Sequence, residues 1–158
     1  AERSERGAAK QTFNSERLGV AAMGLGIVER CLELCTRYAS NRTQFGQPIG
    51  HFQLIQLKLA HMEVVRLNLQ NFLFRHIEAL ASGKAISAVE ASACKLYAGQ
   101  ATLTVCLEAV QVFGGHGYMA ENRVEQLARD AKVLQIYGGT DEVQVLQIAR
   151  GLLAGQTA

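Results

Sequence analysis

A single proline, Pro48, stands in the whole chain of 158 residues. Proline lacks a backbone N–H group and kinks or ends a helix, so its near absence allows long uninterrupted helices. Apolar residues recur every three or four positions along most of the sequence, which is the spacing of one face of a helix. Short connections make sequential long helices antiparallel neighbours. The sequence therefore predicts an all-α fold, an up-down helical bundle.

Breaks between the periodic stretches give the expected boundaries. Residues 1–12 show no periodicity and are expected to form a flexible lead-in, with the helical bundle domain over residues 13–158. The first helix is expected to begin at Asn14 or Ser15, either of which can cap a helix, and to end before the break at residues 46–48. Further helices are expected over residues 50–82, 87–113, 124–134 and 141–153. No strand is expected.

Two helices have a defined apolar stripe that is expected to face the core. The stripes are Leu18, Ala22, Leu25, Val28, Leu32, Cys35 and Ala39 in the first helix, and Ile55, Leu59, Met62, Leu69, Phe72, His76 and Leu80 in the second. Gly24 and Gly26 each cost the first helix about 1 kcal/mol relative to alanine. Two such glycines indicate that another segment approaches this helix closely.

Composition excludes several classes of protein. An apolar fraction of 49% argues against disorder, and a net charge of +2 without a basic run gives no indication of nucleic-acid binding. No apolar run is long enough to span a bilayer, and the polar N-terminal residues lack a secretory signal, so a bacterial cytoplasm or a mitochondrial matrix is the expected location. The four cysteines are expected to be buried free thiols. No histidine or cysteine spacing indicates a metal site.

Two glycine-rich segments have plain structural interpretations. Residues 137–140 read as a tight turn before a helix that Thr140 caps, although a glycine pair opening onto helix amides can also receive a phosphate. Residues 114–117 read as a glycine helix stop. A dinucleotide fingerprint is rejected there, because the segment follows a helix rather than a strand and position 120 is alanine.

Three segments nevertheless carry a resemblance. Residues 42–46 (RTQFG), 109–118 (AVQVFGGHGY) and 135–142 (QIYGGTDE) resemble the C-terminal helical domain of the acyl-CoA dehydrogenases, and the likeness extends from Phe13 to Leu153. Most members of this flavoenzyme family carry their catalytic glutamate in the third segment, where this chain has Gly138. Glu16 stands where the isovaleryl-CoA and long-chain members carry their base. The resemblance therefore implies that Glu16 is the catalytic residue.

From the residues alone, Glu16 is a carboxylate in the first helical turn and Arg17 an exposed arginine beside it. The resemblance instead implies that Arg17, Tyr137 and Gly138 contact the substrate. It also implies contacts with flavin adenine dinucleotide (FAD), partly across a subunit interface. The FAD-binding residues implied are Arg42, Gln44, Phe45, Gln53, Gln111, Val112, Gly115, Thr140 and Glu142.

The function implied is α,β-dehydrogenation of an acyl-CoA thioester to a trans-2-enoyl-CoA, as in fatty acid β-oxidation. Family members also contain an N-terminal helical domain and a β-domain, so this chain is expected to be catalytically incomplete alone. The implied partners are the acyl-CoA substrate, further copies in a dimer or tetramer or a polypeptide supplying the missing domains, and electron-transfer flavoprotein. A non-catalytic assembly module and a related flavin oxidase or monooxygenase stay open as alternatives.

Overall fold

The computed structural model of the protein describes the backbone of residues 2–154 and the side chains of Thr12 and residues 14–154. Its elements are α1 (Glu2–Asn41), β1 (Thr43–Gln44), β2 (Gln47–Pro48), η1 (Ile49–His51), α2 (Gln53–Ala81), α3 (Ala88–Phe113), α4 (Gly115–Tyr118), η2 (Ala120–Asn122), α5 (Val124–Val133) and α6 (Asp141–Ala154). The described chain is thus almost entirely helical, which confirms the predicted all-α fold.

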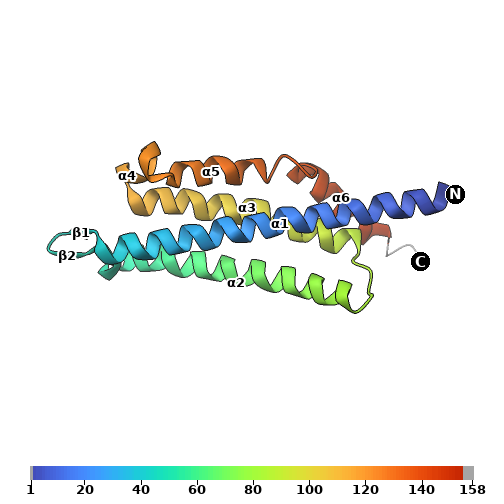
Figure 1. Ribbon diagram of the computed structural model, residues 1–158, viewed down its shortest axis with the longest axis horizontal. Coiled ribbons are helices and arrows are strands. Elements are labelled where there is room, and N and C mark those ends of the chain that lie inside the picture. The colour runs from blue at the N-terminus through green and yellow to red at the C-terminus, as the bar shows by residue number, and fades with distance from the viewer. Residues whose placement is uncertain (1, 155–158) are drawn as a thin grey trace.

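Figure 1 shows α1, α2 and α3 running side by side along the long axis, with α5 and α6 lying along α3. The start of α1 and the end of α6 lie at one end of the bundle, and the β1–β2 hairpin lies at the other. Because α3 contacts every other long helix, it forms the centre of the bundle. No described helix combines the length and the apolarity that a bilayer span requires.

The expected start of the first helix is wrong. α1 begins at Glu2, twelve residues before Asn14. The segment before Asn14 is rich in alanine, glutamate, arginine, lysine and glutamine, which have high helix propensity even without an apolar stripe. Glu16 consequently lies about four turns inside α1, so the helix N-terminus does not act on it. The division into a lead-in and a bundle domain stays a prediction.

The other helices match their expected ranges within three residues. Ser87 caps α3 in a capping box with Glu90, whose side chain in turn accepts from the Ser87 backbone. The β1–β2 hairpin was not expected. It pairs Thr43 with Pro48 and Gln44 with Gln47 around a two-residue turn in which both φ angles are positive. Strands of two residues are too short to leave an alternating pattern.

The core lies mainly between α1 and α3. A Cβ on Gly24 would lie 2.7 Å from Thr102 Oγ1, so the absence of a side chain lets the two helices approach. No atom lies within 4 Å of the same position on Gly26, so the expected close approach is wrong there. Ala22 and Leu80 are exposed rather than buried, since each lies at the edge of its stripe.

The remaining core expectations hold. All four cysteines are buried and free, as predicted, and Cys31 Sγ lies 3.6 Å from Cys106 Sγ across the α1–α3 interface. His76 is a buried core histidine whose Nδ1 bonds the Phe72 carbonyl one turn earlier in α2.

Candidate active site

The connection between α5 and α6 is built on two adjacent glycines. Gly138 and Gly139 have φ angles of 62° and 88°, a left-handed region that favours glycine because it has no Cβ. The Asp141 N–H donates to the Gln135 carbonyl at 3.1 Å and closes the connection. We call residues 137–140 the glycine turn; α6 begins directly after it.

The side chain of Glu16 on α1 lies against the glycine turn. A Cβ on Gly138 would lie 3.9 Å from Glu16 Oε1 and 3.2 Å from Val20 Cγ2. A side chain at position 138 would therefore enter the space beside the Glu16 carboxylate. Glu16 is itself exposed, so a molecule bound on this side of the turn can reach its oxygen atoms.

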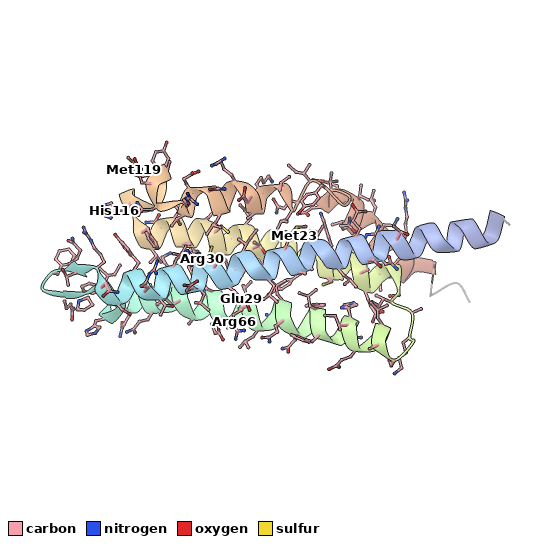
Figure 2. All side chains as sticks on the ribbon, in the orientation of Figure 1. Met23, Glu29, Arg30, Arg66, His116 and Met119 are labelled. Atoms are coloured by element: carbon pink, nitrogen blue, oxygen red, sulfur yellow. The ribbon has the colours of Figure 1, made fainter. Side chains whose placement is uncertain are left out.

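Tyr137 completes the contact between the glycine turn and α1. Its hydroxyl donates to Met23 Sδ at 3.5 Å, and burial raises the pKa of this phenol. Met23 is labelled on α1 in Figure 2. Glu16, Val20 and Met23 follow at spacings of four and three residues, so they share one face of α1. This face and the glycine turn bring Glu16, Tyr137 and Gly138 into one site.

Arg17 and Asn14 tie this part of α1 to the α2–α3 connection. Arg17 Nη1 donates to Asn14 Oδ1 at 3.0 Å, and Asn14 Nδ2 donates to the Ile86 carbonyl at 3.1 Å. Arg17 is half-buried, and its Nε is buried without a hydrogen-bond partner among the described residues. Arg17 is thus not an exposed first-turn arginine, and Asn14 joins two elements instead of capping one.

Thr140 directly precedes α6, and Glu142 lies in its first turn. Thr140 Oγ1 accepts a hydrogen bond from the Val143 N–H at 3.4 Å, as expected of a cap. The Thr140 hydroxyl also bonds the Glu142 carboxylate and lowers the pKa of that group. Glu142 is exposed beside the turn, and its carboxylate is held ionised there.

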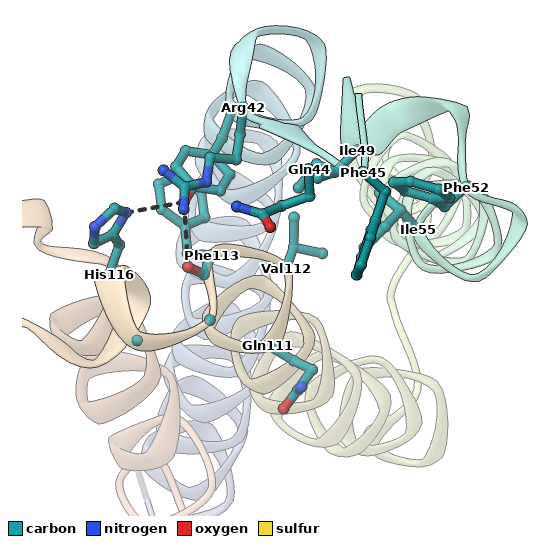
Figure 3. A pocket seen from close by; sticks show the side chains of 13 residues that line it. Arg42, Gln44, Phe45, Ile49, Phe52, Ile55, Gln111, Val112, Phe113 and His116 are labelled. Atoms are coloured by element: carbon teal, nitrogen blue, oxygen red, sulfur yellow. Dashed lines mark hydrogen bonds between the residues drawn. The ribbon is translucent and has the colours of Figure 1, made fainter. Parts of the chain in front are cut away.

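A second hollow lies at one end of the bundle, next to the β1–β2 hairpin. We call it the hairpin-end cavity; its volume is about 430 Å³. Figure 3 shows the side chains around it, which come from α1, the hairpin, η1, α2 and the α3–α4 junction. The lining residues are Tyr38, Arg42, Gln44, Phe45, Ile49, Phe52, Ile55, Gln111, Val112, Phe113, Gly114, Gly115 and His116.

Aromatic contacts shape the wall of this cavity. The Tyr38 and Phe113 rings stack at 4.0 Å, and the Tyr38 hydroxyl lies 3.0 Å from His116 Nδ1. Phe45 is 91% exposed, so its ring is available to a bound group. No acidic residue lines the cavity, and in the described part of the chain no carboxylate pairs with Arg42. The cavity therefore suits a ligand with an anionic group and a ring.

Known proteins similar to this chain identify its family. Residues 6–153 match the family model described as acyl-CoA dehydrogenase, C-terminal domain. The chain belongs to this family.

Individual relatives agree with this membership. The chain is 44% identical over 147 residues to an acyl-CoA dehydrogenase of Bacillus subtilis, which covers 93% of this chain and 38% of the relative. It is 37% identical over 145 residues to the caffeyl-CoA reductase–Etf complex subunit CarC of Acetobacterium woodii, covering 92% and 38%. The structure of butyryl-CoA dehydrogenase from Megasphaera elsdenii matches with a TM-score of 0.87 at 40% identity, covering 92% and 38%. The chain thus spans 38% of the length of each of these proteins.

In this acyl-CoA dehydrogenase domain, the residues predicted to contact the cofactor fall into two groups. The hairpin-end cavity gathers Arg42, Gln44, Phe45, Gln111, Val112 and Gly115. Thr140 and Glu142 lie instead beside the glycine turn, and Gln53 is exposed at the start of α2 outside the cavity lining. Asp141 lies over Gly99, and Gln111 follows twelve residues later on α3, which is about 18 Å. The two groups therefore lie far apart within one copy.

Sequence reasoning missed Lys95 and Gln144, both fully buried beside the glycine turn. Lys95 Nζ lies 3.5 Å from Asp141 Oδ1, an ion pair between α3 and α6. Burial lowers the pKa of Lys95, and the Asp141 carboxylate opposes that shift. The available signal was a lysine directly after the small residues 91–94, since a lysine on an apolar face is rarely buried unless paired.

Proposed function

We propose that this chain forms the C-terminal part of an FAD-dependent acyl-CoA dehydrogenase and that Glu16 is its catalytic base. One observation carries the proposal: Glu16 Oε1 lies 3.9 Å from the position that a Cβ of Gly138 would occupy. By the resemblance, most family members place the catalytic glutamate at the position of Gly138. The carboxylate of Glu16 would therefore lie close to the position of that glutamate, although it comes from a different helix.

Glu16 takes the α-proton of the thioester onto a carboxylate oxygen. This step requires the bound thioester to place its α-proton within hydrogen-bond reach of that oxygen. Tyr137 and Gly138 border the bound thioester, and the missing side chain at Gly138 leaves room for it. Arg17 fixes this part of α1 through Asn14. A bound flavin supplies the acceptor for the β-hydrogen, which leaves as hydride. The product is a trans-2-enoyl-CoA.

The base position narrows the substrate class. A base at Glu16 resembles the arrangement in isovaleryl-CoA and long-chain members of the family, so we propose a branched or long acyl thioester. The remaining walls of the acyl pocket would come from the N-terminal and β-domains that such enzymes contain.

The residues of the hairpin-end cavity fit part of FAD. The Arg42 guanidinium has no carboxylate partner among the described residues, and its fork suits a pyrophosphate. No acidic side chain lines the cavity to repel a phosphate. Arg42, Gln44, Phe45, Gln53, Gln111, Val112 and Gly115 would hold the cofactor at this end.

The separation of the two groups supports an oligomer. Thr140 and Glu142 would lie near a flavin bound beside the glycine turn, far from the hairpin-end cavity of the same copy. We therefore propose a homodimer or homotetramer in which two copies hold each FAD. Electron-transfer flavoprotein is the proposed electron acceptor, which the name of the Acetobacterium woodii relative supports.

The test uses the holoenzyme that contains this chain. The holoenzyme is mixed rapidly with acyl-CoA in the absence of oxygen, and the rate of flavin reduction is measured. Glu16→Gln should slow reduction at least about 100-fold while FAD stays bound, because general-base catalysis typically contributes that much. Glu29→Gln is the matched control, since Glu29 is an exposed glutamate of the same helix about 20 Å further along. It should reduce flavin at the wild-type rate.

Three other outcomes would change the assignment. Reduction of Glu16→Gln at the wild-type rate would show that the base is another residue. A wild-type protein whose flavin no acyl thioester reduces would favour the non-catalytic assembly module. Rapid oxygen consumption by the reduced wild type would favour an oxidase on the same fold.

A further inference from the structure

Gln144 on α6 holds the glycine turn from behind. Its side chain is fully buried, and Nε2 donates to the Gly138 carbonyl at 3.1 Å and to the Gly139 carbonyl at 2.9 Å. A side-chain amide has two N–H donors, so both are used on adjacent carbonyls. The side chain therefore contacts the backbone of the turn directly at two adjacent residues.

The fit between Gln144 and the turn leaves no spare space. A Cβ on Gly139 would lie 2.6 Å from Gln144 Nε2, closer than two such atoms can approach. The carbonyls of Gly138 and Gly139 both face the Gln144 amide on α6, which donates to them. Without the amide, both carbonyls of the half-buried turn would lose their side-chain donor, and a carbonyl left without a partner costs the desolvation of that group.

The base of α6 is itself fixed to the bundle. The buried Lys95–Asp141 ion pair joins α3 to the first residue of α6, three residues before Gln144. The Gln144 backbone N–H also donates to the Thr140 carbonyl at 3.0 Å. The ion pair thus fixes the start of α6 against α3, and Gln144 fixes the turn that faces Glu16 against α6.

We propose that Gln144 is a positioning residue that holds Gly138 at its distance from Glu16 and so sets the width of the thioester site. The proposal rests on the proposed function, because the site it shapes is that of the dehydrogenation. It requires that losing the two donated hydrogen bonds lowers kcat and not only stability.

Gln144→Glu is the informative variant because glutamate has nearly the same shape. A protonated glutamic acid donates one O–H to the turn carbonyls, whereas the ionised form donates none and repels both. The kcat of this variant, divided by that of the wild type, should therefore fall about tenfold or more as pH rises. Gln144→Met removes the donors at every pH, so its kcat ratio should be low and independent of pH.

The ratio to the wild type removes the titration of groups that both proteins share. The charged or titratable groups around the turn are Tyr137 in the turn itself, Glu16 and Arg17 on α1, Lys95 on α3, Lys132 on α5, and Asp141 and Glu142 on α6. None of them is altered in either variant. A merely structural role would lower the melting temperature of both variants without giving a pH-dependent kcat ratio.

Hydrogen–deuterium exchange of residues 135–142 in the same holoenzymes gives a readout that needs no activity. Faster exchange in Gln144→Met, confined to this segment, is the expected result. Unchanged exchange, or a kcat of Gln144→Met equal to that of the wild type, would overturn the proposal. If the wild type dehydrogenates no thioester, the proposed function fails, and the positioning role in catalysis fails with it. Exchange then still decides whether Gln144 holds the turn.

Discussion

At Gly138 the chain has no side chain, and Glu16 brings a carboxylate to the adjoining space from another helix. The family resemblance was sufficient to predict this pairing, since it matched both positions to sites of a catalytic base. The pattern of residues alone was not sufficient to predict the pairing. It placed Glu16 in the first turn of a helix that actually begins at Glu2. Gln144 gave no sequence signal, since a glutamine near the start of a helix is ordinarily exposed.

Gly138→Ala should lower the free energy of unfolding by about 1–2 kcal/mol, the cost of placing an L-residue in the left-handed region. Its φ of 62° disfavours a Cβ, which would also lie 3.2 Å from Val20 Cγ2. Urea unfolding measures the change. Gly19→Ala is the control, because no atom lies within 4 Å of its Cβ position in α1. That control should be as stable as the wild type or more so, and an equal loss in both variants would contradict the account.

At the scale of whole elements, apolar periodicity and glycine stops predicted α2, α3, α5 and α6. They failed at the start of α1, where polar residues of high helix propensity extend the helix without a stripe. They also missed the β1–β2 hairpin, whose turn depends on positive φ at Phe45, a non-glycine residue that sequence alone does not mark. The pattern therefore predicted the helices that have an apolar stripe and bounding glycines, but not the polar extension of α1 or the short hairpin.

The α1–α3 contact makes two neighbouring glycines respond oppositely to alanine. Gly24→Ala should destabilise the protein, because the new Cβ would lie 2.7 Å from Thr102 Oγ1. Gly26→Ala should stabilise it by up to about 1 kcal/mol, since alanine favours the helix and no atom lies within 4 Å. Denaturant unfolding of both variants checks the pair. Equal effects of the same sign would show that the two helices are not in close contact at Gly24.

Removing one partner of the Lys95–Asp141 pair between α3 and α6 should lower the free energy of unfolding strongly. Replacing both partners by apolar residues should lower it little. Lys95→Met leaves Asp141 as an uncompensated carboxylate and should cost about 3–5 kcal/mol. The double variant Lys95→Met/Asp141→Leu should recover most of that loss. A double variant as unstable as Lys95→Met alone would argue against the ion pair.

The same lysine gives a pH dependence of known sign. Because burial lowers the pKa of Lys95 from its ordinary 10.5, the unfolded chain binds the proton more tightly than the folded one. The free energy of unfolding should therefore rise with pH between the folded pKa and 10.5. This increment should vanish in the double variant. Unfolding curves recorded across that window measure it, and an identical slope in both proteins would contradict the assignment to Lys95.

For the whole molecule, the informative feature is the distance between its two candidate sites. The hairpin-end cavity lies beside the β1–β2 hairpin at one end of the bundle, whereas the glycine turn lies where Asp141 packs on Gly99, about 18 Å away along α3. The family resemblance already implied FAD contacts partly across a subunit interface, but the order of motifs along a chain does not say which of them meet in space. Their separation within one copy supports the proposal of an oligomer with FAD shared between copies.

The central claim, that Glu16 removes the α-proton, is tested most directly by isotope exchange. An acyl-CoA analogue with sulfur in place of the β-carbon can lose its α-proton but has no β-hydrogen to transfer. The wild-type holoenzyme should exchange the α-proton of this analogue with deuterium from D₂O, and Glu16→Gln should not. Glu16→Gln/Gly138→Glu should restore part of the exchange, because the new carboxylate enters the adjoining space. Exchange by Glu16→Gln at the wild-type rate would contradict the account.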